Sequence, residues 1–75
     1  MRRVQDAQGR SWDVVVGRES WGAFVALFVP AGDHGEVRQA RLAARGRAEA
    51  ETEVEALDTQ ELLTLLARSE PKELA

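Results

Sequence analysis

The side chains that could support metal binding or catalysis are few, because this 75-residue sequence contains one histidine and no cysteine. His34 stands beside Asp33 and close to Glu36, so these residues form a cluster with metal-ligand chemistry. One imidazole and two carboxylates on a glycine-containing loop lack the ligand number and the rigidity of a protein metal centre. We therefore expect a solvated loop here, and predict neither a metal nor a cofactor.

The residues that could act as a nucleophile, an acid or a base show no catalytic pattern either. No serine has a spacing to the single histidine that supports a hydrolase. Asp13 and Glu19 are expected on a strand and in a loop, where no pocket would tune their pKa values apart. The segment Gly17-Arg-Glu-Ser20 has one glycine and no following Gly-Lys-Ser, so it is not a phosphate loop. We predict no catalytic residue, no enzymatic activity and no small-molecule substrate.

Aromatic and arginine side chains together are typical of a surface that binds single-stranded nucleic acid, by stacking bases and neutralising phosphates. The charge distribution weakens this interpretation. Residues 1–47 carry eight arginines against five acidic residues (+3), but residues 48–75 carry −6, which gives the chain a net charge of −3. Nucleic-acid binding is therefore the alternative function, for which the candidate residues are Arg10, Arg18, Arg38 and Arg41, with the rings of Trp12, Trp21, Phe24 and Phe28.

Strands are predicted to position these side chains over the first half of the chain. The turn Asp6-Ala-Gln-Gly9 suits a bulged hairpin, because Asp caps the turn and Gly supplies a left-handed residue, so strands are expected over 2–5 and 10–16. Gly17–Ser20 is interpreted as a four-residue loop leading to a third strand over 21–29, which Pro30 ends. Segment 37–43 fits a strand or a helix, and we predict a fourth strand that continues the meander.

Helices are predicted for the second half. Asp58 and Glu61 form a capping box and Leu57 and Leu62 occupy the flanking staple positions, so a helix is expected over 59–69, with Pro71 beyond it. Segment 48–57 alternates Glu as a strand would, yet Glu and Ala are depleted in strands, and helix is the favoured interpretation. The predicted fold is α+β, in which a four-stranded antiparallel meander carries the C-terminal helix on one face.

The four-residue loop fixes a register in which Val16 faces Trp21, and this register divides the side chains between two faces. The helix would cover a core face of Trp12, Val14, Val16, Trp21, Val25 and Leu27. The opposite face would carry Val15, Phe24, Ala26 and Phe28, with little of the chain left to cover it.

An uncovered patch with two phenylalanines predicts an interaction surface. A chain this short buries only about 60% of the surface that it exposes when unfolded, so association would add stability. We expect a non-enzymatic interaction module or accessory subunit that meets a protein partner or a second copy through this face. A self-sufficient monomer is the other interpretation. No signal peptide or membrane-spanning run is recognised, which predicts a cytoplasmic protein.

Three motifs occur together in this chain: Gly9-Arg-Ser-Trp-Asp-Val14, Gly17-Arg-Glu-Ser-Trp-Gly22 and Leu57-Asp-Thr-Gln-Glu-Leu62. In this respect it resembles short uncharacterised bacterial proteins that begin with a Gly-Arg-x-Trp strand, carry a Gly-Arg-Glu-Ser-Trp-Gly turn and end in a short Glu-Leu helix before a proline. The resemblance covers most of the chain, and its turn is more specific than its helix. It implies a single-domain architecture and a bacterial source, and it does not indicate a function.

Overall fold

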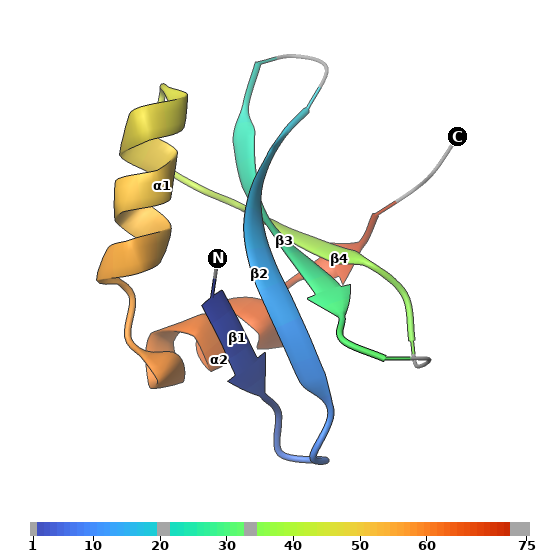
Figure 1. Ribbon diagram of the computed structural model, residues 1–75. Coiled ribbons are helices and arrows are strands. Elements are labelled where there is room, and N and C mark those ends of the chain that lie inside the picture. The colour runs from blue at the N-terminus through green and yellow to red at the C-terminus, as the bar shows by residue number, and fades with distance from the viewer. Residues whose placement is uncertain (1, 20–21, 33–34, 73–75) are drawn as a thin grey trace.

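The computed structural model describes residues 2–19, 22–32 and 35–72, which form one antiparallel sheet and two helices (Figure 1). The strands follow the order of the sequence across the sheet, β1-β2-β3-β4-β5. The predicted α+β fold with a C-terminal helix on the sheet is confirmed, and the structure adds a short fifth strand. The elements are β1 (Arg2–Gln5), β2 (Ser11–Arg18), β3 (Phe24–Pro30), β4 (Arg38–Arg41), α1 (Arg47–Ala56), α2 (Thr59–Ala67) and β5 (Glu70–Pro71).

The first hairpin forms as its turn residues predict. The Asp6 N–H donates to the Arg10 carbonyl at 2.8 Å, and the Gly9 N–H donates to the Asp6 carbonyl at 3.0 Å. Gly9 has a φ of +81°, the left-handed conformation that glycine adopts without strain. β1 therefore occupies residues 2–5 as expected, and Val4 faces Trp12 across the pair.

The second hairpin repeats this geometry, and the register predicted from a four-residue loop is wrong. The Glu19 N–H donates to the Ala23 carbonyl at 2.8 Å, and Gly22 has a φ of +91°, so the chain reverses after Glu19 and not at Gly17. Val16 consequently faces Ala26, five residues beyond the predicted partner. Because side chains alternate between faces, this odd shift moves every β3 side chain to the opposite face of the sheet.

This shift overturns the predicted interaction face. Phe24, Ala26 and Phe28 lie in the core, and the exposed fractions of the two phenylalanines are 6% and 0%. Val15 remains on the outer face, where it is half-buried, so the four residues do not form one surface. Trp21, which the sequence placed in the core, lies outside the described residues. The core consists of Val4, Trp12, Val14, Phe24, Ala26, Phe28, Ala40, Leu42, Ala50, Val54, Leu62 and Leu65.

The outer face of the sheet buries part of its own apolar surface, although Val25 and Leu27 lie there and not under a helix. A Cβ atom on Gly17 would lie 2.5 Å from the Leu27 Cδ1 atom and 3.4 Å from the Val25 Cγ2 atom. The Leu27 side chain therefore occupies the space above the glycine, and Val25 is only 2% exposed. This explains how a strand with two apolar faces is accommodated in a chain with too few helices to cover both.

Both helices pack against the inner face of the sheet and contribute to its core. The capping box of α2 forms as predicted: the Asp58 carboxylate accepts from the Glu61 N–H at 2.7 Å, and the Glu61 carboxylate accepts from the Asp58 N–H at 2.9 Å. α2 ends at Ala67, and the chain then forms β5 against β4. Segment 48–57 is helical, as favoured, and the guanidinium of Arg2 holds its end by donating to the carbonyls of Val54, Glu55 and Leu57.

Candidate binding groove

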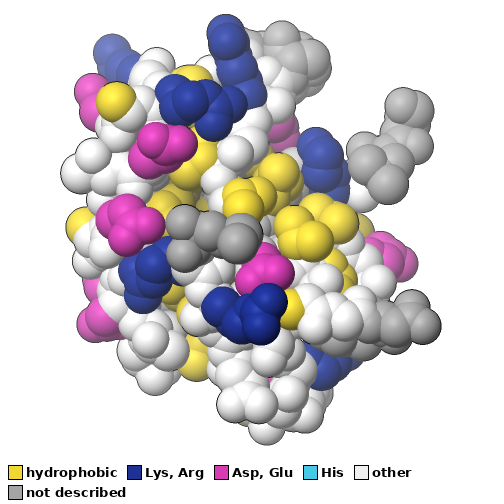
Figure 2. All heavy atoms as spheres, in the orientation of Figure 1, with side chains coloured by type: hydrophobic (Ala, Val, Ile, Leu, Met, Phe, Trp, Pro, Cys, Tyr) yellow, Lys and Arg dark blue, Asp and Glu magenta, His cyan; other side chains and the backbone are white. Residues whose placement is uncertain are grey.

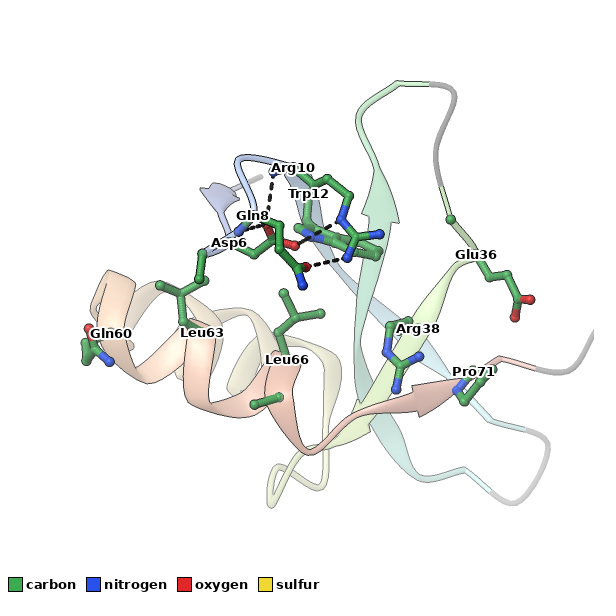
Figure 3. A pocket seen from close by; sticks show the side chains of 13 residues that line it. Asp6, Gln8, Arg10, Trp12, Glu36, Arg38, Gln60, Leu63, Leu66 and Pro71 are labelled. Carbon is green, nitrogen blue, oxygen red and sulfur yellow. Dashed lines mark hydrogen bonds and ion pairs between the residues drawn. The ribbon is translucent and has the colours of Figure 1, made fainter.

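An open groove of about 760 Å³ lies between the β1–β2 turn, the β4–β5 edge and α2 (Figure 3). Trp12 contributes the floor, because its side chain lies at the inner end of the groove with only 5% of the residue exposed. One wall is formed by α2, and the rims carry charged side chains from the β1–β2 turn and from β4. The volume is within the range of about 300–1,000 Å³ that is common for ligand sites.

The β1–β2 turn fixes one charged rim through Asp6. Its carboxylate accepts from the Trp12 Nε1–H at 3.0 Å and from the backbone N–H groups of Gln8 and Arg10 at 2.9 Å each. The Arg10 guanidinium lies 3.5 Å from the same carboxylate and also donates to the Gln8 side chain. Arg10 is exposed, so these contacts orient a cation at the mouth of the groove without removing it from solvent.

The same contacts favour the charged form of Asp6. The hydrogen bond from Trp12 is the main cause that lowers the pKa of this carboxyl; burial opposes it, and the two backbone N–H groups and the Arg10 charge add to the lowering. On the outer face, the hydrogen bond from Arg3 likewise lowers the pKa of Asp13, and this pair raises the pKa of Arg3. Carboxyl groups with lowered pKa values are poor proton donors at neutral pH, so Asp6 acts as a structural anion.

The opposite rim is formed by Arg38. Its Nε–H donates to the Ser69 Oγ atom at 2.9 Å, and its Nη2 atom donates to the Ser69 carbonyl. Ser69 is only 8% exposed, and its hydroxyl donates in turn to the Leu66 carbonyl at the end of α2. The guanidinium has five N–H donors, and these contacts use two of them. Arg38 is therefore held rigidly and retains donors for a ligand.

Leu63 and Leu66 form the apolar wall of the groove. Both are half-buried and pack against the edge of the core, whereas Leu62 and Leu65 on the same helix are buried. Figure 3 shows these two side chains on α2, facing the turn that carries Arg10. The groove thus combines an apolar wall with two guanidinium groups. It suits a ligand that carries both apolar and anionic groups.

The structure separates the residues proposed for nucleic-acid binding. Arg10 and Arg38 share the groove, whereas Arg18 lies 5.8 Å from the centroid of the Phe24 ring at the other end of the sheet, and Arg41 is exposed on the outer face. Among the described aromatic residues, Trp12, Phe24 and Phe28 are at most 6% exposed. A platform for stacking bases is therefore absent from the part of the chain that the structure describes.

Metal-ligating groups do not converge either. Within residues 2–19, 22–32 and 35–72, no three His, Cys, Asp or Glu side chains are close enough to hold a metal ion. Asp33 and His34 of the predicted cluster lie outside these residues. Glu36 is exposed and lines the groove.

Sequence reasoning recognised Arg10, Arg38 and Trp12, but missed the groove that brings them together. The signal that could have found it is the broad leucine stripe Leu62, Leu63, Leu65 and Leu66, which the sequence reasoning assigned entirely to covering one face of the sheet. Comparison with family models, with curated proteins and with solved structures gave no match. None of the described helices is both long and apolar enough to span a membrane.

Proposed function

We propose that this protein is a non-enzymatic interaction module that binds an extended acidic segment of a partner protein in the groove above Trp12. The observation that carries the proposal is that the apolar wall of Leu63 and Leu66 and the guanidinium groups of Arg10 and Arg38 line the same groove. An extended peptide alternates its side chains, so acidic residues can reach the two rims while apolar residues lie against α2.

Asp6 and Glu36 balance the charges of Arg10 and Arg38 in the groove, and the two guanidinium groups are its binding points for carboxylates. Arginine binds carboxylates with two parallel hydrogen bonds, and both arginines are oriented before the ligand arrives. Arg10 is held by Asp6, and Arg38 is held by Ser69. Holding the side chains in place reduces the conformational entropy that binding must overcome.

The described aromatic rings give less support to nucleic-acid binding. Stacking requires a ring face open to solvent, and Trp12 uses its indole N–H on Asp6 and is buried. An oligonucleotide is therefore the competing ligand in the test below.

The test is fluorescence anisotropy with three labelled probes: a peptide of alternating glutamate and leucine, its lysine–leucine counterpart and an oligo-dT strand. We expect the acidic peptide alone to bind, with a dissociation constant on the order of 10–100 μM, as is common for small and open sites. Arg10→Gln should weaken binding about five- to tenfold through loss of a charge-assisted hydrogen bond, and Leu63→Gln should weaken it further.

The matched control is Arg41→Gln, which makes the same change at an exposed arginine on the outer face of the sheet. It should leave the affinity unchanged. If oligo-dT bound and the acidic peptide did not, with a steep loss in salt, the nucleic-acid interpretation would replace this one. Equal effects of Arg10→Gln and Arg41→Gln would show that binding depends on net charge and not on the groove.

A further inference from the structure

β2 has an edge that no strand covers within the described residues. In β2, the odd-numbered residues bond to β3, since Glu19 donates to Ala23 and the Ser11 carbonyl accepts from Ala31. In an antiparallel sheet, the backbone groups of the even-numbered residues must then point to the opposite side, toward β1. β1 pairs with Trp12 and Val14 there, and its first described residue is Arg2, opposite Val14. The N–H and C=O groups of Val16 and Arg18 therefore face a position that no strand of the described residues occupies.

The stretch of β2 along this edge is Val15-Val-Gly-Arg18, which contains neither a proline nor a lysine and has Arg18 as its one charged residue. A groove of about 390 Å³ runs beside it, between β2 and α1, and is lined by Val14, Val15, Val16, Glu51, Val54 and Glu55. Figure 1 shows β1 beside one half of β2 and α1 beside the other half. The site has the length of a short strand and an apolar floor.

Charges of both signs are arranged along this edge in a fixed order. Arg47, at the start of α1, and Arg18, at the end of β2, lie at the same end of the sheet, since their guanidinium carbons are 5.9 and 5.8 Å from the centroid of the Phe24 ring. The other end of α1 is held by Arg2, opposite Val14. Glu51 and Glu55 follow Arg47 at intervals of one helical turn, and both line the groove. Figure 2 shows acidic side chains over α1 and hydrophobic side chains over β2 on this side of the molecule.

We propose that a second copy of this chain binds here, so that the β2 edges of two copies pair antiparallel about a two-fold axis at Gly17. Val16 of each copy would then face Arg18 of the other, which forms four backbone hydrogen bonds. The axis brings each Arg18 beside Glu51 of the other copy and sets the two α1 helices antiparallel, so that Arg47 also lies toward Glu51 of the other copy. The basic end of each edge thus meets an acidic side chain of the other copy, which makes the interface self-complementary.

This self-complementarity selects a second copy over an unrelated strand. A foreign peptide would have to supply both signs of charge in the matching order, whereas this chain carries that order itself. The interface is separate from the groove at Trp12, with which it shares no residue. The dimer and the peptide-binding function can therefore succeed or fail independently.

Sedimentation equilibrium of the full chain up to about 1 mM tests the dimer, and we expect a dissociation constant in the micromolar range. Arg18→Glu and Glu51→Arg should each weaken association at least about tenfold, through like charges in contact. The double variant should restore it to within about threefold of the original chain, because the pair is re-formed with its signs exchanged. Arg41→Glu, on β4 and away from the edge, is the matched control and should have no effect.

Amide hydrogen exchange of the unmodified chain provides a second readout that requires no folded variant. The N–H groups of Val16 and Arg18 should exchange more slowly as the concentration rises, while those of Val15 and Gly17, already bonded to β3, should not change. A chain that stays monomeric near 1 mM would overturn the proposal. A dimer whose Val16 amide exchanges quickly, or one that the charge exchange does not restore, would also overturn it.

Discussion

The phase of α2 determines both the core and the wall of the groove, and neighbouring leucines on this helix test it. Leu62 is fully buried, whereas Leu63 is half-buried at the groove. Leu62→Ala removes buried methyl groups and leaves an enclosed cavity, which costs about 2–5 kcal/mol. Leu63→Ala leaves a space that water can fill, so we expect about 1 kcal/mol or less.

These costs are large relative to the stability of so small a domain. At about 0.05–0.15 kcal/mol per residue, a chain of this length has an unfolding free energy of about 4–11 kcal/mol. Its unfolding entropy implies that each 1 kcal/mol lowers Tm by about 6 °C. Leu62→Ala should therefore lower Tm by about 12–30 °C, and Leu63→Ala by no more than about 6 °C.

Urea unfolding followed by tryptophan fluorescence measures both variants, with the slope of the free energy against urea as a check on two-state behaviour. If Leu62→Ala does not fold, the buried Leu65 and the half-buried Leu66 provide the same comparison one turn later. A cost at Leu63 equal to or above that at Leu62 would refute the orientation of α2. The apolar wall of the groove would then be lost with it.

Three further predictions concern the contacts that hold the elements in place. Asp58→Ala removes the carboxylate that accepts from the Glu61 N–H and should lower the free energy of unfolding in urea by about 1 kcal/mol. Asp58→Ser keeps a capping oxygen and should lower it by only a few tenths of a kcal/mol. Arg2→Gln removes the donors to three carbonyls at the end of α1 and should cost about 1–2 kcal/mol. Arg3→Gln, which breaks an exposed ion pair on the same strand, should cost less than Arg2→Gln. The lowered pKa of Asp6 predicts stability that is fully present above the unfolded-state pKa of about 3.9 and is lost as the pH falls through the lower folded-state value. Asp6→Asn should therefore reduce stability at pH 7 and bring the two acid-unfolding curves together at low pH; curves that stay parallel would show that Asp6 does not stabilise the turn through its charge.

Local signals in the sequence predicted most of the elements. The turn at Asp6 and Gly9, the β-branched run of β2 and the capping box at Asp58 each act within a few residues, and each gave the correct element. β5 was missed because two residues carry no periodicity, and Pro71 suggested only the end of a helix.

The register of the second hairpin required more than composition. Gly17–Ser20 and Glu19–Gly22 are both acceptable turns by residue type, and choosing the first reversed the two faces of β3. The signal that distinguishes the two turns was Gly22, which is left-handed and follows Glu19 at the same sequence spacing as Gly9 follows Asp6. The prediction of an exposed phenylalanine face failed because one turn determines the orientation of a whole strand.

The sequence by itself determined the elements, the caps and the apolar surplus of the sheet, because these depend on backbone preferences and on short spacings along the chain. Only the tertiary structure decided which surfaces remain open. It brought Arg10, Arg38, Leu63 and Leu66 to one groove, packed Leu27 over Gly17 and, among the residues that the structure describes, left no strand beside Val16 and Arg18 on the β1 side of β2. These features depend on register and on the meeting of segments far apart in the chain, which no local pattern specifies.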